Sequence, residues 1–178
     1  RDPRDGSGSR AREQRVPVNR FQFLRNRVAR AHAALAAQVA AQGHPWQTPI
    51  ALLSGGECTV SVKGSGRGGR CSEYLLGLAM ALGEPWGQHC QAGGKRIWAL
   101  ACDTDGIDGS EDNAGALLTP DSLARAKVLG IDPVRHAADN DAWGFFSALG
   151  DLVVTGPTLT NVNDYRLIMV TAGDDLRQ

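Results

Sequence analysis

Residues 52–73 read LLSGGECTVSVKGSGRGGRCSE, which predicts a turn, a strand, a glycine-rich turn and a helix in that order. From Cys58 to Lys63, apolar and polar residues alternate with a period of two, as in a strand buried on one face. Four of the next six residues are glycines, which allow positive φ angles and close approach of the backbone to a ligand. Residues 71–82 have the apolar density of a packed helix. The glycine-rich loop should therefore lie at a helix N-terminus.

Two arginines, Arg67 and Arg70, lie in or beside this loop. Unpaired N–H groups at a helix start, the positive end of the helix dipole and guanidinium groups all favour an anion. The alternative is a tight turn with its arginines in water, because short glycine patterns are weak signals. Arginines three residues apart at a helix start place both heads near one opening, so we expect an anion-binding site here.

The chain has 178 residues, 42% of them hydrophobic, which is enough for one core and one domain. The net charge is zero, but residues 1–30 hold nine arginines against three acids and residues 101–178 are acidic. The basic segment lacks interleaved aromatic residues and a known nucleic-acid motif, so we expect no nucleic-acid partner. There is no apolar run long enough for a membrane span and no secretory signal.

The four cysteines form no CxxC pair and the four histidines are scattered. We expect buried, reduced thiols in a cytoplasmic protein and no structural zinc site. No serine, histidine and acid arrangement predicts a nucleophile.

Residues 1–18 are charged and contain Gly-Ser repeats, which predicts a disordered leader or linker before a domain at 19–178. Apolar residues from Phe21 to Val39 recur at helical spacing, and Gly43 supplies a stop. Further helices are expected at 121–129 and 139–149, and strands at 50–53, 96–102, 152–154 and 166–170. The strand at 50–53 should form a hairpin with 58–63. Strands that alternate with helices predict an α/β fold, with three α/β/α layers and a mixed sheet.

Three carboxylates, Asp103, Asp105 and Asp108, directly follow a buried strand. Loops at the carboxyl ends of strands hold ligands in open α/β sheets, so this loop and the glycine-rich loop should share a crevice. Carboxylates together with phosphate oxygens could hold Mg²⁺. The alternative is a turn stabilised by aspartate side chains.

Two further patterns leave alternatives open. Residues 64–69 satisfy G-x-G-x-x-G, but a dinucleotide site needs a parallel unit, whereas the preceding strand looks like half of a hairpin. Residues 155–164 are rich in hydroxyls and amides, which could bind a phosphorylated or polyhydroxylated ligand or satisfy their own backbone.

Taken together and in this order, four motifs resemble the MOFRL domain, the C-terminal half of type-2 glycerate kinases, some of which carry the label hydroxypyruvate reductase. The motifs are SGGE at 54–57, GxGRGGRxxE at 64–73, DTDGIDG at 103–109 and TGPTxTNVND at 155–164. The resemblance implies phosphoryl transfer from ATP to the 2-hydroxyl of D-glycerate, with Mg²⁺. The reaction would take place in a cleft shared with an N-terminal α/β domain that this sequence lacks, so the chain alone should be inactive.

The resemblance also implies residue roles. Arg67 or Arg70 would bind the glycerate carboxylate and stabilise the transferring phosphoryl group. Asp105 would join them in catalysis, and Asp103, Asp105 or Asp108 would hold the metal. The substrate-binding set comprises Ser54, Gly55, Gly56, Glu57, Gly66, Gly68, Gly69, Thr158, Asn161, Asn163 and Asp164.

The sequence departs from the family pattern at a few positions. Cys71 and Ser72 replace an Asn-Gln pair, and Leu159 replaces a glycine, which should narrow the pocket or change the turn. Two other functions stay open, an NAD(P)H-dependent hydroxypyruvate reductase and a non-catalytic anion-binding module. The oligomeric state is open too, with a homodimer among the alternatives.

Overall fold

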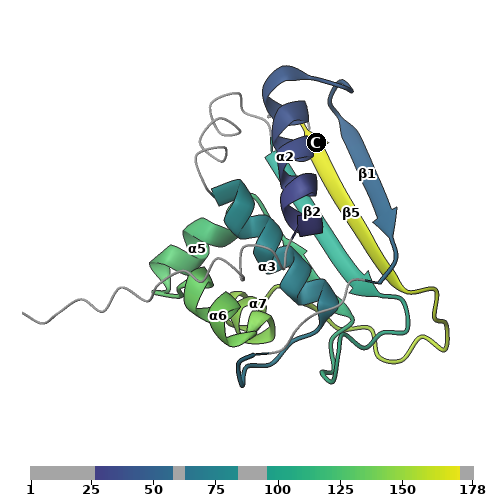
Figure 1. Cartoon of the computed structure of the whole chain (residues 1–178), viewed down its shortest axis with the longest axis vertical. Helices are drawn as coiled ribbons and strands as arrows, with labels where there is room; N and C mark the ends of the chain where they lie inside the picture. Colours follow the sequence, from purple (N-terminus) through teal and green to yellow (C-terminus); the bar gives the residue numbers. More distant parts are fainter. Residues whose placement is uncertain (1–26, 58–62, 84–95, 173–178) are drawn as a thin grey trace, which may run out of the picture.

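The computed structural model describes residues 27–57, 63–83 and 96–172 (Figure 1). Its helices are α2 (Arg27–Gln42), α3 (Arg70–Gly83), α5 (Ser122–Val128), α6 (Pro133–Asp139) and α7 (Ala142–Leu149). Its strands are β1 (Ile50–Gly55), β2 (Arg96–Asp103), β3 (Gly115–Leu118), β4 (Leu152–Val153) and β5 (Asp164–Thr171). The expectation of a leader at 1–18 lies outside the described residues, as does most of the strand at 58–63.

The five strands form one sheet in the order β1-β5-β2-β3-β4, with α2 and α3 beside it (Figure 1). The predicted α/β class is confirmed. The mixed sheet is wrong for the described strands, because every pairing is antiparallel. β1 and β2 do run in the same direction, but the last strand, β5, lies between them and pairs with both. The strand expected to form a hairpin with β1 lies mostly outside the described residues, and the partner of β1 among the described strands is β5.

One hydrophobic core lies on one face of the sheet. Buried residues alternate along β2 and β5, and Ala99 pairs with the buried Ile168 on the same face. The core continues into the apolar sides of α2 and α3 and into Phe145 and Phe146 of α7. The described helices that contact this core lie on one side of the sheet, with α5, α6 and α7 packed against α3. The three-layer prediction is therefore not met within the described part of the chain.

Several helix boundaries follow the sequence signals. Gly43 adopts φ +68° and its N–H donates to Val39 O at 2.9 Å, which ends α2 as predicted. Pro133 is the first residue of α6, a helix that the sequence analysis did not predict, and Asp132 caps it by accepting from Val134 N. The helix expected at 139–149 begins only at Ala142, because Asn140 adopts φ 58° and separates α6 from α7. The prediction missed β3 altogether.

Two expectations about the chain as a whole can be compared with the described residues. Cys71 and Cys102 are free thiols, and burial raises the pKa of both. Cys58 and Cys90 lie outside the described residues. Within the part that is described, there is no helix with the length and apolar character needed to cross a membrane.

Gly115 of β3 lies too close to the backbone of β2 to accept a side chain. A Cβ there would lie 1.9 Å from Ala101 O, a backbone atom that cannot rotate away. We expect Gly115→Ala to lower the free energy of unfolding by at least about 2 kcal/mol, because the two strands must separate. Gly150→Ala is the control, since a Cβ at that position meets nothing within 4 Å and carries only the strain of φ +73°. Urea denaturation of both variants measures the difference, and equal losses would contradict the close approach.

Candidate functional site

Charged residues from four separate motifs meet at one end of the sheet. β1 and β2 end there and β5 begins there, with Asp103 directly opposite Asp164 in the strand register (Figure 1). Arg70 reaches this end from the first residue of α3, and Glu57 reaches it from the turn after β1. We call this group, with Arg166 of β5, the arginine–carboxylate network.

Arg70 is held by three carboxylates. Its Nη2 lies 2.7 Å from Asp103 Oδ2, 3.1 Å from Asp164 Oδ1 and 3.2 Å from Glu57 Oε1. Its Nε also donates to Asp164 Oδ1 at 3.2 Å. Asp103 and Asp164 are buried, whereas the side chain of Arg70 is 31% exposed. Among the described residues Nη1 of Arg70 has no hydrogen-bond partner, so this fixed cation keeps one donor group for a further acceptor.

Burial and ion pairing oppose each other in this network. Burial acts to lower the pKa of Arg70, but its hydrogen bonds to Asp164 and the negative charges of Asp164 and Glu57 raise it overall. Burial raises the pKa of Asp103, against the hydrogen bond from the Asp105 N–H and the charge of Arg70. Arg70 thus stays charged under all ordinary conditions.

Arg166 belongs to the network and was missed from the sequence. It is 3% exposed and donates through Nη2 to Asp164 Oδ2 at 2.9 Å. The strand 164–171 alternates buried and less buried residues, and Arg166 falls on the buried side. An arginine at an inward position of such a strand was the signal available.

The glycine-rich loop packs against the turn between α6 and α7. Its N–H groups already have acceptors in that turn: Lys63 and Gly64 donate to Asn140 Oδ1, Ser65 to Asp139 Oδ1, Gly66 to Asp139 O and Arg67 to Asp141 Oδ1. A Cβ at Gly64 would lie 2.1 Å from Asp139 O, and one at Gly66 would lie 2.5 Å from Asp141 Cβ. Gly68 lies against the backbone of Trp143 in the same way. The lack of side chains at these glycines therefore makes room for the turn at residues 139–141 of the same chain.

The N-terminus of α3 does bind a carboxylate, but it belongs to Asp108. Asp108 is 1% exposed and accepts from Cys71 N at 2.9 Å and from Ser72 N at 2.8 Å. Burial raises the pKa of Asp108, although these hydrogen bonds oppose the shift. A Cβ at Gly69 would lie 2.2 Å from Asp108 Oδ1, which explains that glycine. The helix start is thus satisfied internally.

Arg67 and Arg70 have different partners. Arg67 pairs with Glu111, and its guanidinium lies 3.7 Å from the centre of the Trp143 ring. Its side chain is 56% exposed, so it faces solvent beside the glycine-rich loop. The two arginines share no acid among the described residues. The structure therefore offers two cationic positions in place of the single converging pair that the sequence predicted.

The acidic loop packs on the threonine–asparagine loop, a contact that the sequence analysis did not predict. Thr104 Oγ1 donates to Asn163 O at 2.9 Å and accepts from Val162 N at 2.8 Å, and Thr158 N donates to Asp105 O at 2.9 Å. Asn161 Nδ2 donates to Asp105 Oδ2 at 3.3 Å. Much of the polar surface of these loops is therefore used to hold one loop against the other.

A metal held by all three aspartates has no support in the geometry. Asp108 is turned to the start of α3 and Asp103 to Arg70, while Asp105 Oδ1 accepts from Ile107 N at 2.9 Å. Within the described ranges no three histidine, cysteine, aspartate or glutamate side chains gather into a metal-binding group. Of the three, Asp105 is the only one that is not buried.

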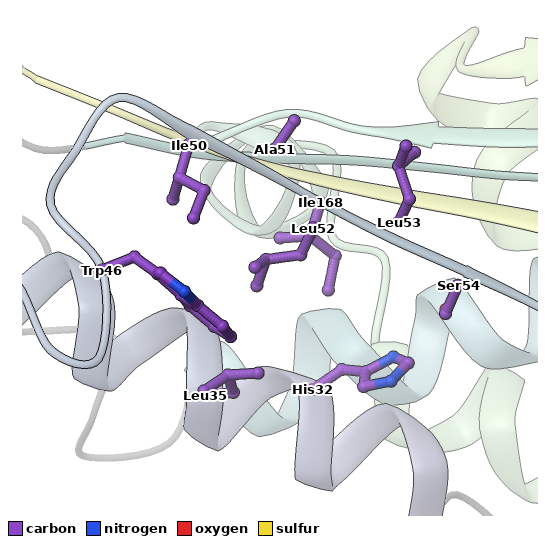
Figure 2. A pocket seen from close by; sticks show the side chains of 9 residues that line it. All are labelled: His32, Leu35, Trp46, Ile50, Ala51, Leu52, Leu53, Ser54 and Ile168. Atoms are coloured by element: carbon purple, nitrogen blue, oxygen red, sulfur yellow. The ribbon is translucent and has the colours of Figure 1, made fainter.

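A cavity of about 400 Å³ lies between α2 and β1 (Figure 2). Ile50, Leu52 and Ser54 point into it from β1, and Leu35 and His32 line it from α2 (Figure 2). The walls are mainly apolar. Ser54, which was expected to bind substrate, thus lines this cavity.

A protein-family match shows to which family the chain belongs. The model described as the MOFRL family matches residues 50–164, which include all four motifs. The chain belongs to the MOFRL family. This confirms the resemblance drawn from the motifs.

The relatives that the MOFRL chain matches are longer than the chain itself. It is 51% identical over 143 residues to an Agrobacterium vitis protein named "Putative hydroxypyruvate reductase", covering 79% of this chain and 31% of that protein. It is 36% identical to the D-glycerate 2-kinase of Thermotoga maritima, covering 74% of this chain and 30% of the relative. The crystal structure of glycerate kinase from Thermotoga maritima matches with a TM-score of 0.72 and 34% identity, over 80% of this chain and 32% of that one. The MOFRL chain thus spans about a third of these relatives.

Leu159, the departure from the family glycine, keeps a backbone shape that suits glycine. Its φ is +61° and its side chain is 98% exposed. We expect Leu159→Gly to raise the free energy of unfolding by roughly 1 kcal/mol, because it removes the left-handed strain and loses no packing. Leu159→Ala is the control, since alanine keeps a Cβ at the same φ. Urea denaturation compares them, and an equal gain in both variants would assign the effect to the exposed leucine side chain.

His32 should give the folded chain a measurable pH dependence. Burial, and secondarily the charge of Arg166, lowers the pKa of His32. The unfolded chain therefore binds the proton more readily, and the stability tied to neutral His32 is present above about pH 6.5 and lost as the pH falls toward the lower folded value. We expect His32→Gln to show a smaller fall in Tm between pH 8 and pH 5 than the unsubstituted protein, while His44→Gln, at an exposed site, keeps the original fall. Identical slopes in all three proteins would refute this assignment.

Proposed function

We propose that this chain forms the MOFRL part of a glycerate 2-kinase, which transfers the γ-phosphoryl group of ATP to the 2-hydroxyl of D-glycerate. The names of its kinase relatives support the reaction. The chain spans about a third of those proteins, so the remainder of the active site, including an N-terminal α/β domain, would come from the rest of a longer protein.

The observation that carries the proposal is the state of Arg70. Its guanidinium is fixed by Asp103, Asp164 and Glu57, yet it is partly exposed and keeps Nη1 unbonded within the described residues. A guanidinium of this kind suits the carboxylate of glycerate or an oxygen of the transferring phosphoryl group. Because the three acids set its orientation before substrate arrives, little reorganisation is needed as negative charge develops in the transition state.

Other predicted residues take supporting positions in this proposal. Glu57, with Gly55 and Gly56, forms the rim of the network next to Arg70. Arg67 offers a second exposed cation that can meet a phosphate. Thr158, Asn161 and Asn163 border the network through the acidic loop.

The fit to ATP and Mg²⁺ is limited in these residues. The amides of the glycine-rich loop donate to the α6–α7 turn, so that loop has no row of open donors for phosphates. The three aspartates do not form a metal group among the described residues. Asp105 is the one carboxylate of the loop with partial exposure, and as a predicted catalytic residue it would position the glycerate hydroxyl. No step of the proposal passes through a metal held by this chain.

The alternative function, a hydroxypyruvate reductase, is suggested by the name of the Agrobacterium vitis relative. A nicotinamide cofactor would need the glycine fingerprint at the start of a parallel βαβ unit. Here the described sheet is antiparallel, and Gly66 N donates to Asp139 O at 2.9 Å. These contacts favour the kinase. If the protein turns over neither pair of substrates, the function to expect is that of a non-catalytic anion-binding module.

The decisive experiment uses the full-length protein that contains this chain. With D-glycerate, ATP and Mg²⁺ we expect 2-phosphoglycerate, detected by a coupled assay. Hydroxypyruvate with NADH or NADPH should give no consumption of the reduced cofactor. Cofactor consumption without phosphoglycerate would overturn the kinase proposal, and no turnover with either substrate pair would favour the binding module. Fractionation of the cells that produce the protein tests whether it is cytoplasmic. The mass of the purified protein in solution tests whether it is a dimer.

Arg70 is the residue on which the rate should depend most. We expect Arg70→Lys to lower kcat/KM by roughly 10²- to 10³-fold, because lysine cannot keep the bonds to Asp103 and Asp164 while presenting an outward donor. Arg125→Lys is the matched control: Arg125 pairs with Asp151 at 2.6 Å in a network around α5. Steady-state kinetics of both variants measure the effect. Equal rates for the Arg70 variant and the unsubstituted enzyme would contradict the assigned role.

A further inference from the structure

We propose that Arg166 is a positioning residue, which sets the orientation of Arg70 by joining the end of β1 to the start of β5. The inference rests on the proposed kinase function for its readout. Arg166 itself is 3% exposed, so it acts through the residues around it and does not touch substrate.

Arg166 connects two sides of the network. Its Nη2 donates to Gly56 O at 2.7 Å and its Nη1 to Gly55 O at 3.4 Å, while Nη2 also reaches Asp164 Oδ2 at 2.9 Å. Glu57, one of the three acids on Arg70, directly follows the carbonyls that Arg166 holds. One guanidinium therefore places both Glu57 and Asp164 for Arg70.

The division of the Asp164 carboxylate makes this connection specific. Oδ2 accepts from Arg166 and Oδ1 accepts from Nε and Nη2 of Arg70. A rotation of this carboxylate would break both sets of bonds together. Because Asp164 is fully buried, water cannot replace a lost partner without cost.

The turn that Arg166 holds has few other constraints. Gly56 adopts φ +100°, and a Cβ there would meet nothing within 4 Å. Its N–H donates to Asp164 O at 3.2 Å, so the turn is tied to the same residue from both directions. Hydrogen bonds to Arg166 and Asp164 therefore hold the residue that directly precedes Glu57.

The other side of Arg166 is supported by an aromatic ring. Its guanidinium carbon lies 5.1 Å from the centre of the Tyr74 ring, and Tyr74 Oη is hydrogen-bonded to His32 Nδ1 at 2.8 Å. His32, which lines the cavity of Figure 2, is thus connected to Arg166 through Tyr74. A buried arginine–carboxylate pair contributes little net stability compared with apolar packing, so fixed geometry explains it better.

The test is Arg166→Lys in the full-length enzyme. Lysine keeps the charge but cannot bind two carbonyls and a carboxylate with a planar fork. We expect kcat/KM for D-glycerate to fall about tenfold, as for loss of an outer-shell partner. Arg125→Lys is the matched control, because Arg125 also donates to a carbonyl, Leu149 O at 3.0 Å, and to a carboxylate, Asp151. It should keep kcat/KM even where its Tm falls by as much as that of Arg166→Lys.

A double-mutant cycle separates positioning from stability. If Arg166 acts through Arg70, the double variant Arg166→Lys with Arg70→Lys should lose no more activity than Arg70→Lys alone. Losses that multiply would show that Arg166 acts independently of Arg70 and would overturn the inference. An unsubstituted enzyme without kinase activity would defeat the proposed function, whereas an active enzyme insensitive to Arg166→Lys would defeat this inference alone.

Gly56→Ala tests the same connection without disturbing a buried charge, and so serves if Arg166→Lys does not fold. The new Cβ strains φ +100° and should shift the carbonyl that Arg166 binds. Gly130→Ala is its control, with φ +69° and nothing within 4 Å of the Cβ. We expect Gly56→Ala to lower kcat/KM and to be non-additive with Arg70→Lys, while Gly130→Ala leaves kcat/KM unchanged. Equal kinetics for the two glycine variants would again refute the inference.

Discussion

The carboxylate of Asp164 is the interaction on which the functional end of the molecule depends. It lies at the first residue of β5, the strand that pairs with both β1 and β2. From there it receives Arg70 on one oxygen and Arg166 on the other. With no exposure to water, it must find its partners within the protein, so the two arginines and the strand ends are fixed together. Placing β5 between β1 and β2 is what makes this possible.

The glycine-rich loop shows how a phosphate-like pattern can serve the protein's own packing. Its glycines permit close approach, as the physical argument requires, but the groups that approach are Asp139, Asp141 and Asp108 of the same chain. The start of α3 has the predicted affinity for a negative charge, and Asp108 supplies it. The adjacent Ser72 hydroxyl accepts from Gly69 N at 3.1 Å, so this departure from the family pair still contributes a bond to the loop. The start of α3 therefore binds a negative charge as expected, but the charge comes from the protein's own Asp108.

Two consequences follow for the chemistry of the site. With the loop amides occupied, the proposed recognition of an anion depends on the arginine side chains, above all on the partly exposed Arg70. With Asp108 and Asp103 both buried and paired, the acidic loop acts mainly as structure that holds Arg70 and the threonine–asparagine loop. Arg70 and the acidic loop thus differ in what they contribute to this end of the sheet, although both match motifs of the family.

The sequence by itself determined the α/β class, the helix that follows the glycine-rich loop, the stop at Gly43 and the family. These features depend on local periodicity, on backbone preferences and on ordered motifs, all of which are written in neighbouring residues. It also indicated Glu57, Arg70, Asp103 and Asp164 as members of one site, because each belongs to a separate motif. It could not show that Arg166 completes the network or that Asp108 accepts hydrogen bonds at the start of α3. It also could not show that Arg67 and Arg70 form ion pairs with different acids. Those outcomes depend on contacts between residues 36 to 111 positions apart in the chain, which form only when distant segments pack together in the folded protein.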